Sequence, residues 1–343
     1  MRTIFSPDHR LHVSPGEFTF GTFVPAFEKP ERADLVHARV LATKLGPVEP
    51  PKPQPRDALL AAHDPGLVDF LEHAHPRWLE IGRTGAAYPS SFFTRGMRTD
   101  RVPTGIEAQL TFYCFDGATP ITATTWAAVK SSAETALTAA DLVAGGEKAA
   151  FALCRPPGHH AGYDHFGGYC FLNNAAIAVR RFTEKGAKRV AVLDIDYHHG
   201  NGTQNIFYRD ADVFVVNIHG DPNQEYPYLL GFADERGEGA GEGFNLNLPL
   251  PWGTEVPIWM GALEAGLAAI ADYAPDAVVV SLGVDTFIED PISQFRLTSS
   301  DYLTVGARIA KLGLPTLFVM EGGYAVEEVG INAVNVLLGF EGA

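Results

Sequence analysis

The sequence predicts an α/β fold, in which a single domain is built on a mostly parallel β-sheet with helices on both faces. Its apolar runs are nearly continuous rather than alternating, which indicates strands that are covered on both faces. Amphipathic helical patterns lie between these runs. No internal repeat and no low-complexity linker divides the 343 residues. We therefore expect one domain over residues 1–343.

The individual elements can be assigned in order from about residue 124. Residues 124–146 are rich in alanine, amphipathic and end in Gly-Gly, which predicts a helix. Residues 173–186 predict a second helix that ends at Gly186. The apolar runs predict five strands, at residues 149–154, 189–196, 213–220, 277–285 and 315–323. In parallel sheets the ligand site lies beyond the carboxyl ends of the strands, which is where this sequence carries histidines and aspartates.

Residues 80–122 do not follow this pattern. The segment contains prolines, glycines and many aromatic residues, and it has no clear period. A stretch of this length without periodicity inside a compact protein is usually functional or part of an interface. The alternative is a surface loop that packs on itself.

Composition limits the possible functions. A formal net charge of −15 at pH 7 disfavours nucleic acid as a partner, because the phosphates would be repelled. The same charge suits a cationic substrate, although many acidic proteins use such a charge for solubility alone. No run approaches the roughly 20 apolar residues of a membrane helix, and the N-terminus does not resemble a signal peptide. Three cysteines without a spacing pattern indicate reduced thiols, so we expect a cytoplasmic protein with no membrane partner.

Metal ligands are predicted at the ends of two strands. Asp196 and His198 are two residues apart, so on extended backbone their side chains point to the same side. Asp285 ends another strand and supplies a third ligand. Two carboxylates and one imidazole suit zinc or a similar divalent ion, with iron(II) and cobalt as alternatives, and three protein ligands leave one position open for water. For any one of these residues, a buried ion pair is the alternative.

Acid–base groups are predicted beside the metal. His159 and His160 follow Pro-Pro-Gly at a strand end, and histidine can take and give a proton near neutral pH. Tyr324 follows two glycines at another strand end, where its hydroxyl can donate to the oxyanion of a tetrahedral intermediate. A packed core histidine and a buried structural tyrosine are the alternatives. Together these residues predict metal-dependent hydrolysis of an amide.

The sequence resembles the arginase–deacetylase superfamily, and within it the histone deacetylase-like acetylpolyamine amidohydrolases. The resemblance covers nearly the whole chain and is densest in RPPGHHAG, FGGYCFLNNAAIA, DIDYHHGNGTQ, SLGVDTFIEDPIS and MEGGY. It implies three zinc ligands, namely Asp196, His198 and Asp285. It implies that His160 is the general base and acid, and that Asn201 is the partner of its ring. It also implies that His159 is the electrostatic partner, hydrogen-bonded to Asp194.

The resemblance implies further roles around the metal. Tyr324 matches the catalytic tyrosine of the family. Tyr169 and Tyr226 match the aromatic walls of a tunnel that receives the acyl group. The carbonyl of Gly168 matches the acceptor for the N–H of the substrate amide.

Ion and ammonium sites are implied as well. A structural potassium ion is expected at Asp194 and Ile218, with Asn217 in place of the family's usual serine. Glu107 matches an acid that binds the free ammonium end of the substrate. A second such acid falls at Ala118 in this sequence, although Asp116 is close by.

The resemblance implies a small acetylated amine as substrate and a homodimer as assembly. The segment at residues 80–122 matches an insertion that packs across the dimer interface and narrows the tunnel. The missing acid at Ala118 favours short acetylated diamines, such as acetylputrescine and acetylcadaverine, over acetylspermidine and acetylspermine. The rival functions are an acetyl-lysine protein deacetylase and a non-catalytic protein that binds acetylated amines. Arginase chemistry is disfavoured, because Gly283 occupies the position of an aspartate that serves two manganese ions.

Overall fold

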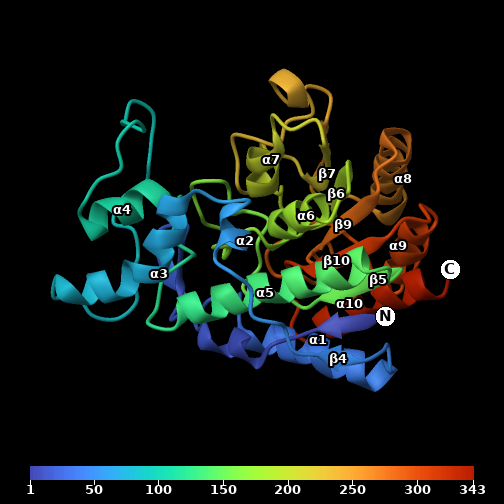
Figure 1. Cartoon of the computed structure of the whole chain (residues 1–343), viewed down its shortest axis with the longest axis horizontal. Helices are drawn as coiled ribbons and strands as arrows, with labels where there is room; N and C mark the ends of the chain where they lie inside the picture. The colour runs from blue at the N-terminus through green and yellow to red at the C-terminus, as the bar shows by residue number, and fades with distance from the viewer.

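The computed structural model describes all 343 residues and contains a central eight-stranded sheet in the order β4-β1-β5-β10-β9-β6-β7-β8 (Figure 1). All neighbouring strands of this sheet pair in parallel. Its strands are β1 (Arg2–Ile4), β4 (Val48–Glu49), β5 (Ala149–Ala152), β6 (Val190–Asp194), β7 (Val213–Gly220), β8 (Asn245–Leu250), β9 (Ala277–Leu282) and β10 (Thr316–Met320). A separate antiparallel hairpin consists of β2 (Glu17–Thr19) and β3 (Thr22–Val24).

Helices cover both faces of the sheet, so the predicted α/β class is confirmed. The core on one face includes α2 (Asp57–Leu60), α3 (Pro65–Glu80), α4 (Ile106–Tyr113), α5 (Thr125–Ala144), α6 (Asn174–Glu184) and α7 (Asn201–Phe207). The core on the other face includes α1 (Pro30–Thr43), α8 (Val256–Tyr273), α9 (Asp301–Ala310) and α10 (Val329–Glu341). Two short 3₁₀ helices are η1 (Pro7–Leu11) and η2 (Gly239–Gly241).

The elements predicted from residue 124 onward are present. The two predicted helices are α5 and α6, and the five predicted strands are β5, β6, β7, β9 and β10. Four of these strands end several residues before the predicted limit, because the polar residues that follow them turn away from the sheet. The prediction for residues 189–196, for example, corresponds to Val190–Asp194.

Residues 80–122 surround α4 and project from the body of the molecule, on the left of Figure 1. The sequence shows no clear period here, and the structure nevertheless contains one helix, Ile106–Tyr113. Ile106, Leu110 and Tyr113 are buried at helical spacing, but eight residues are too few to establish a period. Several large apolar side chains of the segment are exposed: Phe92, Phe93, Met97 and Val102.

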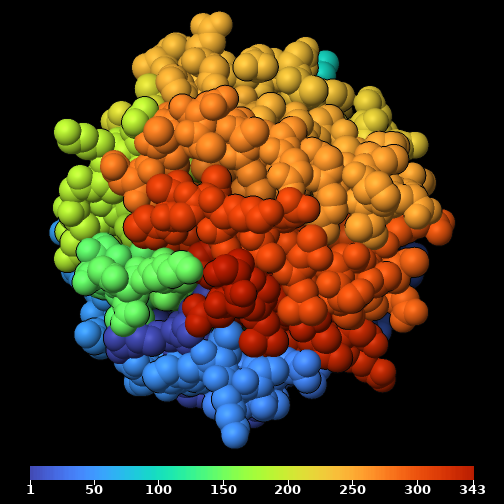
Figure 2. All heavy atoms as spheres, turned by 90° about the vertical axis from the view of Figure 1, so that its right-hand side faces the viewer, coloured from blue at the N-terminus to red at the C-terminus, as the bar shows by residue number.

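Three further features of the fold concern the chain ends, the helices and the cysteines. In Figure 2 the C-terminal segment (red) lies beside N-terminal residues (dark blue), and the Met1 ammonium pairs with Glu341 at 2.9 Å. No helix combines the length and the apolar character needed to cross a membrane. All three cysteines are free and buried, which agrees with reduced thiols.

The carboxyl ends of four strands meet at one edge of the sheet. β5, β10, β9 and β6 are neighbours in that order. The loops that follow them carry, in the same order, His159 with His160, Tyr324, Asp285, and Asp196 with His198. Strand order therefore brings together residues that are far apart in the sequence.

Candidate metal centre and active site

The three predicted metal ligands lie together. The ligand atoms of Asp196, His198 and Asp285 are all within 4.8 Å of one another, and all three residues are buried. His198 Nδ1 is 3.0 Å from Asp285 Oδ2 and 3.4 Å from Asp196 Oδ1. Burial alone would lower the pKa of His198, but its hydrogen bonds to the two carboxylates outweigh burial and raise that pKa well above its usual value. Two carboxylates and one imidazole around one point are a donor set that fits a divalent ion such as zinc.

The backbone brings Asp196 and His198 together by turning after β6, and not by continuing as an extended strand. β6 ends at Asp194, so the prediction that Asp196 and His198 lie on extended backbone is wrong. Asp194 Oδ1 accepts a hydrogen bond from the Asp196 N–H at 3.1 Å. Asp196 Oδ1 in turn accepts one from the His198 N–H at 2.9 Å. Carboxylates that bond to the backbone two residues later stabilise turns, and these turns direct both ligand side chains to the same point.

Backbone N–H groups orient the two carboxylates. The Gly322 N–H donates to Asp196 Oδ2 at 2.8 Å, and the Tyr197 N–H donates to Asp285 Oδ1 at 2.8 Å. A side chain at Gly283 or Gly322 would overlap the Asp196 carboxylate. These two glycines therefore allow the strand ends to close around the ligand group.

The tandem histidines are held in different protonation states. His159 Nδ1 is 3.1 Å from Asp194 Oδ2. Burial opposes its protonation, but Asp196 and Asp194 outweigh burial and raise the pKa of His159 to about 10. His160 Nδ1 bonds instead to Asn201 Oδ1 at 2.6 Å. Burial and the neighbouring His159 and His198 rings hold the pKa of His160 well below its usual value, so this ring is neutral and its Nε2 is free to accept a proton.

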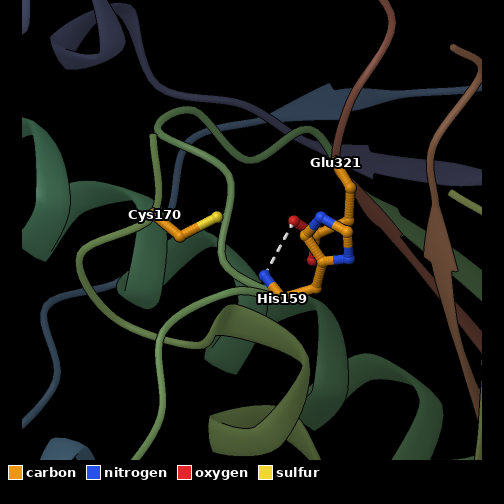
Figure 3. Close-up of side chains that lie close together, drawn as sticks. All are labelled: His159, Cys170 and Glu321. Carbon is orange, nitrogen blue, oxygen red and sulfur yellow. Dashed lines mark hydrogen bonds between the residues drawn. The ribbon is translucent and has the colours of Figure 1, made fainter. Parts of the chain in front are cut away.

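Glu321 binds the backbone that carries the tandem histidines, and the sequence did not indicate it. It follows β10, and its Oε2 accepts a hydrogen bond from the Gly158 N–H at 2.6 Å. The same oxygen accepts a hydrogen bond from the His159 N–H at 3.1 Å (Figure 3). Burial raises the pKa of Glu321 to about 8. Its only signal in the sequence is its place in MEGGY, which did not indicate this role.

His159, Cys170 and Glu321 form a second group with ligand atoms within 4.8 Å (Figure 3). The Cys170 thiol donates to the Gly168 carbonyl at 3.2 Å, and burial raises the pKa of this thiol well above its usual value. A protonated thiol is a poor ligand. His159 Nδ1 is engaged by Asp194. This group is therefore less suited to an ion than the group at Asp285.

Tyr324 is positioned by two residues that the sequence analysis also missed. Asp290 Oδ2 accepts hydrogen bonds from the Tyr324 N–H at 2.7 Å and the Ala325 N–H at 3.2 Å. The guanidinium of Arg32 lies 4.6 Å from the centre of the Tyr324 ring and donates to the Gly323 carbonyl at 2.5 Å. The tyrosine side chain is buried, and its predicted role as an oxyanion donor stays a prediction.

The predicted aromatic walls flank this centre. The Tyr226 ring lies 5.2 Å from the His160 ring and 6.1 Å from the His198 ring, measured between centroids. The Tyr169 ring lies 5.6 Å from the Tyr324 ring. Both wall tyrosines are half-buried, whereas the tandem histidines are buried. The two wall rings therefore lie next to His160 and Tyr324 and are more exposed than the tandem histidines.

The carboxylates of the two predicted ammonium-binding acids are both engaged by the protein itself. Glu107 is exposed on α4 and pairs with Arg83, with Arg83 Nε 3.0 Å from its Oε1. Asp116 lies beside the walls, but both of its oxygens accept hydrogen bonds from the protein itself. One chain therefore gives no geometric support to the predicted ammonium-binding role of either acid.

The predicted potassium residues are neighbours in the sheet. Asp194 and Asn217 are register partners of β6 and β7, and Ile218 follows on β7. Asn217 Oδ1 accepts a hydrogen bond from the Gly200 N–H at 3.1 Å, and its Nδ2 has no partner. A potassium site here stays a prediction.

Comparisons with known proteins identify the family of the chain. Residues 26–339 match the family described as the histone deacetylase domain. The chain is 58% identical to acetylpolyamine amidohydrolase 1 of Pseudomonas aeruginosa, covering 100% of this chain and 99% of that protein. It is 50% identical to acetylpolyamine amidohydrolase of Mycoplana ramosa, covering 100% of both. A crystal structure of acetylpolyamine aminohydrolase from Burkholderia pseudomallei has a TM-score of 0.94 at 42% identity and covers 99% of this chain and 98% of that one.

Proposed function

Because this chain belongs to the histone deacetylase family, we propose that it is a metal-dependent amidohydrolase that removes acetyl groups from small acetylated amines. The observation that carries the proposal is the meeting of Asp196, His198 and Asp285 beside the neutral ring of His160. Names of relatives over the whole chain support acetylated polyamines as the substrate class. The net charge of −15 supports a cationic substrate.

Each residue of the site has a distinct task in this proposal. A divalent ion held by Asp196, His198 and Asp285 would polarise the acetyl carbonyl and lower the pKa of a water. His160 takes the proton of the attacking water at Nε2 and returns it to the leaving amine. His159, kept cationic by Asp194, offsets negative charge in the transition state.

The remaining groups orient the amide. The Tyr324 hydroxyl donates to the oxyanion that develops on the acetyl carbonyl. The Gly168 carbonyl accepts the N–H of the scissile amide. Tyr169 and Tyr226 enclose the acetyl group and the first methylenes of the amine, which excludes water from the bond under attack.

Acetate release tests the reaction and the substrate class together. We expect acetylputrescine and acetylcadaverine to be hydrolysed with higher kcat/KM than acetylspermidine, acetylspermine or an acetyl-lysine peptide. A clear preference for acetylspermine would defeat the assignment to short diamines. Equal turnover of the peptide and acetylputrescine would favour the protein deacetylase instead, and tight binding without turnover would favour the non-catalytic alternative.

The identity of the metal needs its own measurement. We propose zinc, and elemental analysis of the enzyme as purified would distinguish it from iron(II) and cobalt, which the same donor set accepts. An ion-to-chain ratio near one is expected. A ratio near two with manganese would point to arginase-type chemistry.

We also propose that the chain forms a homodimer through residues 80–122. The exposed apolar side chains of this projecting segment support the proposal, because a patch of this kind is usually covered by a partner. The double substitution Phe92→Ser with Phe93→Ser should shift the mass measured by light scattering toward that of a monomer. Ile258→Ser on α8, where the side chain is 56% exposed, is the matched control and should leave the mass unchanged.

A further inference from the structure

Asp116 is a carboxylate whose every acceptor position is engaged by the protein. Its Oδ1 accepts hydrogen bonds from the Ala118 N–H and the Thr119 hydroxyl, both at 3.0 Å. Its Oδ2 accepts from the Gly168 N–H at 2.6 Å and the Tyr226 hydroxyl at 2.8 Å. A carboxylate offers about four lone-pair sites, so none is left for a substrate ammonium.

The partners of Asp116 are the groups that surround the scissile amide in the proposed function. Gly168 supplies the carbonyl that would accept the substrate N–H, and Tyr226 is one of the predicted aromatic walls. The second wall is tied to the same network, because the Thr119 hydroxyl that donates to Asp116 accepts from the Tyr169 N–H at 2.9 Å. One side chain thus links both walls and the amide acceptor.

The backbone next to Asp116 is unfavourable at one residue, Tyr169, which is not a glycine. Gly168 and Tyr169 have φ angles of 59° and 66°, so two successive residues lie in the left-handed region. A side chain at Gly168 would overlap the His160 ring, which shows how closely this backbone approaches the proposed general base. Strained backbone of this kind persists only where surrounding contacts hold it. Thr119 accepts the N–H of the strained Tyr169, and Asp116 accepts the N–H of Gly168 before it and the hydroxyl of Thr119, so both supply such contacts.

We propose that Asp116 is a positioning residue that fixes the positions of the Gly168 carbonyl and the Tyr226 ring relative to the scissile amide. The inference rests on the proposed function, in which the Gly168 carbonyl accepts the amide N–H. Hydrogen bonds from Gly168 N–H and Tyr226 to one carboxylate fix the distance between the acceptor and the facing wall. Asp116 therefore acts through its neighbours and does not contact the substrate.

A comparison of an amide with the matching ester isolates this role. N-acetylputrescine carries the N–H that the Gly168 carbonyl would accept, whereas the acetate ester of 4-aminobutanol lacks it and has the same length and charge. Asp116→Ala removes all four acceptor contacts. We expect it to lower kcat/KM for the amide by about tenfold more than for the ester, since only the amide loses an oriented acceptor. A general loss of folded enzyme would lower both rates equally.

Conservative and distant substitutions complete the test. Asp116→Asn keeps one acceptor oxygen and should restore part of the amide-to-ester ratio. Glu184→Ala removes an exposed acid on α6, far from the predicted site in the sequence, and should leave the ratio as in the wild type. A folded Asp116→Ala enzyme with the wild-type ratio would overturn the inference.

A second pair of variants applies if Asp116→Ala does not fold. Thr119→Val keeps the shape of the side chain and removes the acceptor for the Tyr169 N–H, whereas Thr119→Ser retains the hydroxyl. The ratio should fall in the valine variant and not in the serine variant, and equal ratios in both would overturn the inference. If the wild type hydrolyses neither compound, the proposed function fails and the inference fails with it. If the wild type hydrolyses both compounds and the ratio is unaffected by these changes, only the inference fails.

Discussion

Replacing Asn201 with aspartate would test the proton chemistry assigned to His160. Asn201 Oδ1 lies 2.6 Å from His160 Nδ1, and both side chains are buried. The substitution keeps the shape and the acceptor but adds one negative charge beside the ring. In the wild type, burial and the neighbouring His159 and His198 rings hold the pKa of His160 well below its usual value.

The size of the effect follows from the distance. Two opposite unit charges about 4 Å apart attract by about 4 kcal/mol at an effective dielectric constant of about 20. At about 1.4 kcal/mol per pH unit this would raise the pKa of His160 by about three. The cost of burying the new carboxylate offsets part of this, so we expect a rise of about one to two. A base with a higher pKa stays protonated to a higher pH, and the acid limb of kcat/KM moves upward by the same amount.

The assay is the initial rate of acetate release from acetylputrescine across the acid limb. Asn201→Ala is the matched control with the opposite sign, because it removes the acceptor that favours the protonated His160 ring. Displacement of the limb to higher pH in the aspartate variant and to lower pH in the alanine variant would support the assignment. If both variants are folded and the limb stays where the wild type has it, His160 is not the group that titrates and the reasoning is refuted.

Three further predictions concern the tyrosine, the metal and a buried glutamate. Tyr324→Phe should lower kcat by about a hundredfold or more while the metal content stays the same, because only the oxyanion donor is lost; an unchanged kcat would remove Tyr324 from the mechanism. Chelation should abolish acetate release and lower Tm, because an ion that binds the folded chain and not the unfolded chain stabilises the fold, and zinc should restore both; full activity after chelation would contradict the metal assignment. Burial raises the pKa of Glu17 from 4.5 to about 7, against its hydrogen bond from Tyr169, so the folded protein binds this proton more tightly than the unfolded chain. The stability that results from this proton is complete below pH 4.5 and is lost as the pH rises to about 7. The free energy of unfolding of Glu17→Gln, measured with urea, should therefore rise relative to that of the wild type by on the order of 2 to 3 kcal/mol across that range. A difference between the two proteins that does not depend on pH would contradict this prediction.

The sheet could be predicted because its strands carry a local signal. In β6, Val190 and Val192 enter one core while Ala191 and Leu193 enter the other, so the four positions before Asp194 are all apolar. Such a run is typical of a parallel strand covered on both faces. The polar residues that follow the runs could then be expected to meet at one edge.

The residues that orient the site could not be predicted, because nothing local marks them. Glu321 acts on the backbone of His159, which lies 162 positions earlier, and Asp290 acts on the backbone of Tyr324, 34 positions later. A carboxylate that accepts from backbone N–H groups requires no particular side chain as its partner. A sequence pattern therefore offers nothing to match, and only the folded chain identifies these contacts.

The backbone near Gly283 bears on how many ions the site can use. A side chain at this position would overlap the Asp196 carboxylate, and the Gly322 N–H already occupies Asp196 Oδ2 at 2.8 Å. The oxygen that could bridge to a second ion is thus covered by backbone from two strand ends. No carboxylate from position 283 can enter the ligand group without moving Asp196. In the proposed mechanism, His160 and Tyr324 therefore supply the proton transfer and the oxyanion stabilisation that a second ion would otherwise share.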